Sequence, residues 1–223
     1  MEMYKTLGMF KNYIFIFVLM LCVSCGPTIF QEHIVFDQER EDLTIEYMKE
    51  HYGIEQETPT IVPKMVVVHW TEIPTFQKTI DAFYDTHLPS SRKAISGAGS
   101  LNVSSQFVID RDGLIYSLMP ETTMARHVIG LNHCAIGIEN VGGPDMPLTK
   151  AQLNANVKLI KYLKRKYPIE YVIGHYEYQR FENTELWLEK DKGYRTVKTD
   201  PNKEFMEAIR NRTAQLNFKP IPN

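Results

Sequence analysis

The sequence predicts a mixed α/β domain with a single central β-sheet flanked by helices. Short β-branched or apolar runs, which are typical of buried strands, alternate with longer segments in which apolar residues recur at helical spacing. This alternation indicates one sheet covered by helices rather than an all-α or all-β protein. The chain has 223 residues, 43% of them hydrophobic, which is enough to bury one good core.

Five segments carry the strand pattern. In the first, three consecutive valines run directly into His69, and a later apolar run ends in the same way on His175. Two other segments are separated by the polar stretch 110–113, which is typical of a hairpin turn. The predicted strands are 65–71, 106–109, 114–118, 135–141 and 171–174.

Four segments show helical periodicity. The clearest begins with a capping box formed by Thr149 and Gln152, and it ends before Pro168. The first helix is expected to pack onto the main domain, because so short a segment cannot form a core alone. The predicted helices are 37–53, 75–86, 149–167 and 202–214, with a tether at 26–38 and loops at 89–102 and 176–197.

The N-terminus has the pattern of an export signal, because Lys5 and Lys11 precede an uncharged apolar run at 13–23. The run ends in LCVSCG, which resembles the bacterial lipoprotein box with Cys25 as the lipidated residue. We therefore expect a signal peptide at 1–24 and an exported protein anchored to the membrane through its N-terminal lipid. Gly26 after the cysteine favours the outer membrane, facing the periplasm. The alternatives are an ordinary signal peptide and an N-terminal membrane anchor.

The composition argues against some classes of binding partner and against a disulfide-stabilised fold. The formal net charge is −2 and the charged residues are dispersed, which argues against a nucleic-acid-binding protein. Three cysteines do not make a disulfide framework, and Cys134 is expected to be a buried thiol. We expect a monomer.

Two histidines and a carboxylate are candidate metal ligands. His69 and His175 each end a predicted strand, and parallel neighbouring strands would bring both to the same edge of the sheet. Asp200 could approach from the loop before the last helix. Catalytic zinc usually has three protein ligands of this type and one open position. The alternative is that both histidines are hydrogen-bonded in the core and that Asp200 caps the last helix.

Glu139 is a candidate general base. Side chains alternate along the predicted strand 135–141, so Ile136 and Ile138 would face the core while Gly137 and Glu139 share the other face. A carboxylate beside a glycine has room to activate a metal-bound water. The alternative is a solvated carboxylate on an open sheet face.

Five motifs in this order resemble the N-acetylmuramoyl-L-alanine amidase type 2 family, which also contains the peptidoglycan recognition proteins. The resemblance spans about residues 60 to 212. It implies the fold of that family and a zinc amidase domain at 59–215. The sequence pattern adds a tether and N-terminal helix at 25–58 and a tail at 216–223. The motifs are VVVHWT (66–71), FVIDRDGLIY (107–116), AIGIE (135–139), VIGH (172–175) and KTDP (198–201).

The resemblance implies a zinc hydrolase that cleaves the amide between N-acetylmuramic acid and L-alanine in peptidoglycan or muropeptides. His69, His175 and Asp200 would bind Zn²⁺, Glu139 would activate the water, and Lys198 would stabilise the oxyanion. Expected substrate contacts are His127, Arg126 and Trp70. The rival interpretations are a non-catalytic module that binds muropeptides and a structural envelope lipoprotein that does not.

The chain also departs from the family pattern. The connection from His175 to Asp200 is longer than usual, Arg126 stands where relatives often have tryptophan, and Gln106 replaces a frequent histidine. Apolar residues in the long connection would form either a lid or substrate wall, or a set of anchors that pin it to the domain. These residues are Phe181, Leu186, Trp187 and Tyr194.

Overall fold

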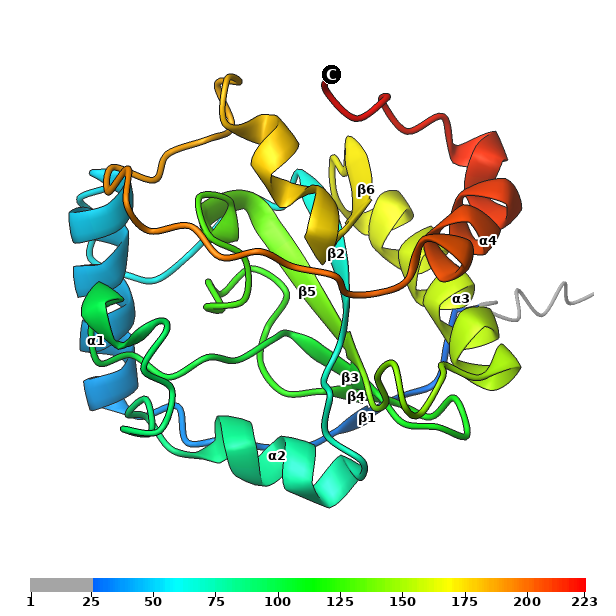
Figure 1. Cartoon of the computed structure of the whole chain (residues 1–223), viewed down its shortest axis with the longest axis horizontal. Coiled ribbons are helices and arrows are strands. Elements are labelled where there is room, and N and C mark those ends of the chain that lie inside the picture. Colours follow the sequence, from blue (N-terminus) through cyan, green and yellow to red (C-terminus); the bar gives the residue numbers. More distant parts are fainter. Residues whose placement is uncertain (1–25) are drawn as a thin grey trace, which may run out of the picture.

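The computed structural model describes residues 26–223, and these contain one six-stranded mixed sheet (Figure 1). The strand order is β1-β4-β3-β5-β2-β6. All neighbouring strands are parallel except β3 and β4, which form the predicted hairpin. The strands are β1 (Ile29–Gln31), β2 (Met65–Trp70), β3 (Phe107–Ile109), β4 (Ile115–Ser117), β5 (Ala135–Asn140) and β6 (Tyr171–Gly174).

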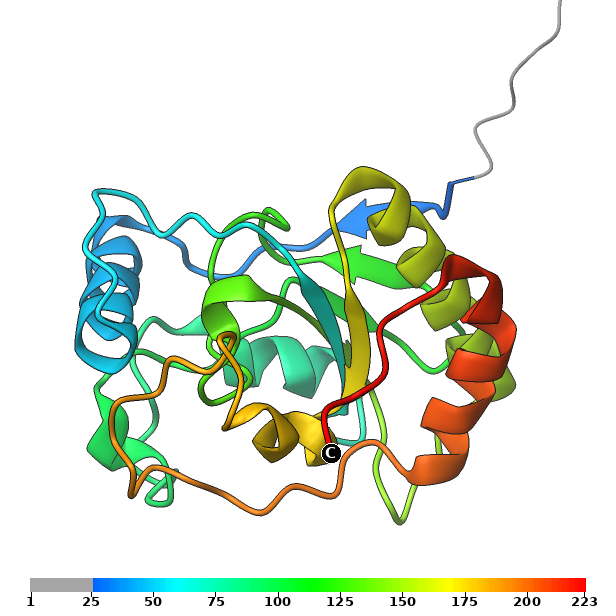
Figure 2. The ribbon, with the colours of Figure 1, turned by 90° about the horizontal axis from the view of Figure 1, so that it is seen from above.

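Helices cover both faces of the sheet, which confirms the predicted class. Figure 2 shows α3 and α4 together on one side, and α1 and α2 on the other. The capping box of Thr149 and Gln152 is present at the start of α3. The helices are α1 (Gln38–Tyr47), which continues into a π-helical turn (Met48–Tyr52), α2 (Phe76–Tyr84), α3 (Lys150–Lys166) and α4 (Lys203–Thr213).

The expected tether at 26–38 is wrong in its first part. Ile29–Gln31 form β1, which pairs in parallel with β4 at one edge of the sheet. Three residues are too few to show a periodicity, so only the partner strand reveals this element. The chain therefore joins the domain almost at the first residue that the structure describes.

Side-chain alternation in the central strands decides what each face carries. In β2, Val66 and Val68 join the core beneath α3 and α4, whereas Met65 and Val67 join the core beneath the N-terminal helix. His69 follows on the second of these faces. In β5 the predicted alternation is confirmed, because Ile136 and Ile138 lie in the α3 and α4 core. The opposite face of the sheet therefore carries His69 of β2 and Glu139 of β5.

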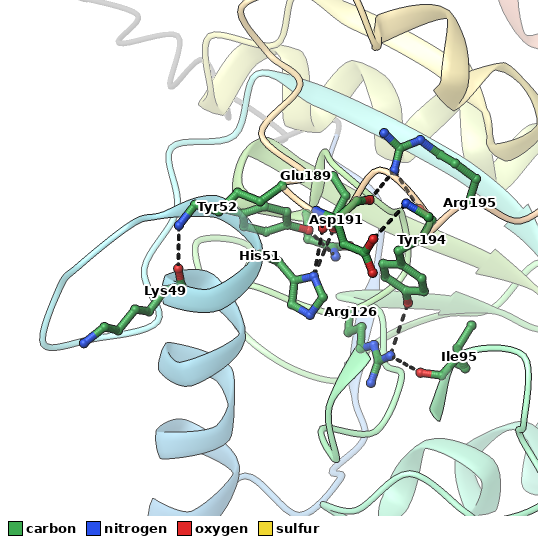
Figure 3. A network of polar contacts seen from close by, with 12 residues as sticks. Lys49, His51, Tyr52, Ile95, Arg126, Glu189, Asp191, Tyr194 and Arg195 are labelled. Carbon is green, nitrogen blue, oxygen red and sulfur yellow. Dashed lines mark hydrogen bonds and ion pairs between the residues drawn. The ribbon is translucent and has the colours of Figure 1, made fainter. Parts of the chain in front are cut away.

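The long connection after β6 is pinned to the domain. It begins as a 3₁₀-helix, η4 (His175–Phe181), and then crosses the sheet to reach the N-terminal helix before returning to α4 (Figure 1). Phe181 is fully buried and Tyr194 is 9% exposed. In Figure 3, Glu189 points at His51, and their side chains approach to 3.0 Å. The anchoring interpretation of the apolar residues is therefore confirmed.

Among residues 26–223, no helix is long and apolar enough to cross a membrane. The predicted export signal and Cys25 lie outside the described residues.

Candidate metal centre

The two strand-end histidines lie side by side, as predicted. His69 is near the carboxyl end of β2, and His175 directly follows β6, which is the parallel neighbour of β2. The Gly174 N–H donates to Glu177 Oε2 at 2.8 Å, which turns the chain into η4 and directs His175 inward. Asp200 comes from the end of the long connection, directly before α4.

Three donor atoms converge at this point. The Nδ1 atoms of His69 and His175 are 2.9 Å apart, and each is 3.1 Å from Oδ2 of Asp200. Zinc bonds of about 2.0–2.2 Å in a tetrahedral site place neighbouring ligand atoms roughly 3.3 Å apart, so the triangle suits that ion. Hydrogen bonds cannot satisfy all three contacts with neutral imidazoles and an ionised carboxylate, because each nitrogen carries at most one proton.

The electrostatics of His175 and Asp200 also suit a metal. Burial lowers the pKa of His175 to about 4, which keeps its imidazole neutral. Burial alone would raise the pKa of Asp200, but His175 and His69 hold that pKa well below its usual range. Neutral imidazoles and an ionised carboxylate are the forms that bind zinc. The helix-cap alternative for Asp200 is wrong, because Asn202 caps α4 by accepting from the Phe205 N–H.

Glu139 lies next to this triangle. It is the register partner of His69 in β5 and shares its face of the sheet. Burial raises its pKa to about 7, with Asp200 adding to the rise, while His69, Lys198 and Arg92 oppose it. Its Oε2 is buried and has no hydrogen-bond partner among the described residues. Glu139 can therefore accept a proton at close to neutral pH, as a general base must.

A cleft of about 320 Å³ opens over the triangle. Glu139 and Lys198 line it together with the three candidate ligands. Trp70 borders the cleft while its Nε1–H donates to Glu72 at 3.3 Å. Arg92 also lines the cleft, together with Lys198 and Arg126, and the sequence analysis missed it. No pattern in the loop 89–102 indicates which of its cationic residues faces the site.

Arg126 borders the cleft mainly as a support for that loop. It is 2% exposed, and its guanidinium donates to the carbonyl oxygens of Ile95, at 2.8 Å, and Leu101. A further bond reaches the hydroxyl of Tyr194 at 3.2 Å, as Figure 3 shows. Contact of Arg126 with a substrate stays a prediction.

His127 has a role that the sequence did not indicate. Its Nδ1 lies 3.0 Å from Nε2 of His69, and its Nε2 lies 3.4 Å from the carbonyl oxygen of Ala135. Burial, followed by repulsion from His69 and His175, holds its pKa well below the usual value. The sequence feature that could have indicated this placement of His127 is Gly137, because a Cβ at that position would come within 2.9 Å of the His127 ring.

Two other residues have structural roles. Cys134 is a buried thiol, as predicted, and burial raises its pKa to about 12. Gln106 accepts the Gly137 N–H at 2.7 Å and donates to the carbonyl oxygen of Thr123 at 2.8 Å. The amide thus ties the hairpin to β5.

A mixed sheet with two histidines at its strand ends, an aspartate brought in by a loop and a further carboxylate beside them has the donor set of a metal-dependent hydrolase. The N-acetylmuramoyl-L-alanine amidase family matches residues 57–203. The chain belongs to that family.

Individual proteins resemble the chain in part of their sequence or in fold. An endolysin of Klebsiella phage KP32 is 31% identical over 85 residues, which cover 35% of this chain and 56% of the endolysin. The chain thus spans about half the length of that curated relative. The amidase LysC of Clostridium intestinale URNW shares the fold, with 20% identity, a TM-score of 0.51 and coverage of 87% of this chain and all of LysC. Peptidoglycan recognition protein-LE in complex with tracheal cytotoxin has the same TM-score at 17% identity, covering 79% and 94% of the two chains.

Proposed function

We propose that this protein is a zinc-dependent N-acetylmuramoyl-L-alanine amidase that hydrolyses the amide between N-acetylmuramic acid and L-alanine in peptidoglycan or its fragments. Family membership supports the reaction class. The observation that carries the zinc dependence is the convergence of three donor atoms from His69, His175 and Asp200 within 3.1 Å of one another.

Each residue around the triangle has a separate role in the proposed reaction. Zinc bound there would polarise the substrate carbonyl and lower the pKa of a water molecule. Glu139 takes a proton from the attacking water and then gives it to the L-alanine nitrogen as the C–N bond breaks. The Lys198 ammonium stabilises the negative charge that develops on the carbonyl oxygen.

The direct test is mass spectrometry of purified peptidoglycan after incubation with the protein. We expect free stem peptides that begin with L-alanine, their loss when a chelator is present, and their return when zinc is added back. Intact glycopeptides in every sample, and intact soluble muropeptides in a parallel digest, would contradict the proposed activity. Tight binding without cleavage would then favour the muropeptide-binding module.

Lys198→Met should lower kcat by about 10²-fold, the usual effect of removing one donor from an oxyanion site, while zinc content stays unchanged. Steady-state kinetics on a soluble muropeptide measures this. Lys192→Met is the matched control, because Lys192 is an exposed lysine of the same connection and does not line the cleft. Equal kcat for both variants would remove Lys198 from the mechanism.

We also propose that the chain is exported and lipidated at Cys25, on the strength of the LCVSCG sequence. Metabolic labelling with a palmitate analogue should mark the wild-type protein and the Cys22→Ala control. Cys25→Ala should lose the label and leave the membrane fraction. Labelling that survives in Cys25→Ala would contradict this site.

A further inference from the structure

We propose that His127 is a positioning residue that fixes the tautomer of His69, so that His69 presents the lone pair of Nδ1 to the metal. The inference rests on the metal site of the proposed function. It gives His127 a different task from the substrate contact that the sequence suggested. The evidence is the two contacts made by the His127 ring nitrogens and the space that Gly137 leaves for this ring.

The assignment of protons begins at a carbonyl oxygen. The Ala135 oxygen can only accept, so the His127 Nε2 that lies 3.4 Å away must carry a hydrogen. In a neutral imidazole the other nitrogen is then an acceptor. Nδ1 of His127 therefore accepts from Nε2 of His69 at 3.0 Å. With its proton on Nε2, His69 has a lone pair on Nδ1.

That lone pair points into the triangle. Nδ1 of His69 lies 3.1 Å from Oδ2 of Asp200, and a lone pair facing a carboxylate oxygen is favourable only when a cation lies between them. Metal-binding histidines generally donate their second ring N–H to a partner that fixes the ring and the tautomer. Here that partner is another histidine.

The surrounding structure holds the His127 ring in this position. Asn132 Oδ1 accepts the backbone N–H groups of His127, at 2.8 Å, and Val128, at 2.7 Å. Asn132 is itself buried and donates to the Tyr52 hydroxyl at 2.8 Å. On the other side Gly137 leaves the space that the ring occupies, because a Cβ would lie 2.9 Å from His127 Cγ.

The other imidazole ligand has no comparable partner. Nε2 of His175 is buried and makes no hydrogen bond within residues 26–223. Removing His127 should therefore affect the metal site through His69 alone. Both ring nitrogens of His127 are already used within the protein, so a substrate that bonded to this ring would have to displace one of these contacts.

Zinc affinity, measured by competition with a chelating dye, tests the inference without any reference to hydrolysis. His127→Phe keeps an aromatic ring but removes the acceptor, and we expect affinity to fall by about 10- to 100-fold. His127→Asn offers an oxygen near the position of Nδ1 and should recover most of the affinity. His33→Phe, at an exposed histidine, is the control and should bind zinc like the wild type.

Gly137→Ala tests the same geometry from the opposite side, because it changes no polar atom but pushes the His127 ring away. It should weaken zinc binding alone and add no further loss in the His127→Phe background. It also remains available if His127→Phe does not fold. Nitrogen-15 spectra of the zinc-loaded wild type should place the His69 proton on Nε2.

Four results would overturn the inference. They are wild-type affinity in folded His127→Phe or Gly137→Ala, no recovery in His127→Asn, additive losses in the double variant, and no proton on Nε2 of His69 in the zinc-loaded protein. If the wild type binds zinc as expected but cleaves no muropeptide, the proposed activity fails while the role of His127 stands. If the wild type binds no zinc, the metal site and this inference fail together.

Discussion

Glu139→Gln should reduce hydrolysis by about 10²- to 10⁴-fold while zinc content remains that of the wild type. The amide cannot take a proton from the attacking water, but it has nearly the shape of the carboxylate and lies outside the donor triangle. Kinetics on a soluble muropeptide, together with metal analysis of the same samples, measures both effects. Glu185→Gln, at an exposed glutamate of the long connection, is the matched control.

The same substitution should stabilise the metal-free protein at alkaline pH. The pKa of Glu139 is raised from 4.5 to about 7, so between these values the folded state binds a proton that the unfolded state has lost. The free energy of unfolding therefore falls as pH rises through this range, by up to about 3 kcal/mol. Urea unfolding at pH 8 should show Glu139→Gln more stable than the wild type by that order, with little difference below pH 4.5.

Either half of this prediction can fail separately. Undiminished hydrolysis in Glu139→Gln would remove Glu139 from the mechanism. Equal stability of the two proteins at pH 8 would show that the carboxylate is not held in a costly environment. A zinc ion in the site would lower the pKa of Glu139, so the acid limb of the activity profile is expected below pH 7.

Asp200→Ala should abolish detectable hydrolysis and leave little zinc after dialysis. It removes the one anionic donor of the triangle and leaves two neutral imidazoles, which are weaker ligands without a third. Zinc at about 1,000 times its Kd stabilises a folded protein by about 4 kcal/mol, so thermal unfolding with and without the ion gives an independent measurement. The wild type should show this stabilisation and the variant should not.

Asp145→Ala is the control for the loss of a carboxylate, because Asp145 is exposed and has no side-chain hydrogen bond or ion pair among the contacts of residues 26–223. It should retain both zinc and activity. Wild-type zinc content in Asp200→Ala would exclude Asp200 as a ligand and, with it, the proposed metal centre.

The features that sequence reasoning predicted well are those whose cause is local. An apolar run that ends on His69, and another that ends on His175, need only a parallel sheet to become neighbours, and β2 and β6 are parallel. Alternation in β5 places Glu139 on the face of His69 for the same local reason. Asp200 was the harder inference, since a loop carries it into the triangle.

The features that escaped prediction depend on contacts between distant segments. Arg126 supports a loop some 25 to 31 residues away in the chain, and no periodicity marks that relation. The contact between His127 and His69 joins an irregular segment to a strand end across 58 positions. The three residues of β1 form a strand only because they pair with β4 at the edge of the sheet.

The early entry of the chain into the sheet limits where a lipid-anchored form of this protein could work. Only Gly26, Pro27 and Thr28 separate Cys25 from the first residue of β1. Fully extended, that connection reaches at most about 14 Å. With the lipid attached at Cys25, the domain would rest against the bilayer instead of ranging through the space above it. The cleft would then meet only glycan strands that pass close to the membrane surface, or soluble fragments that diffuse to it.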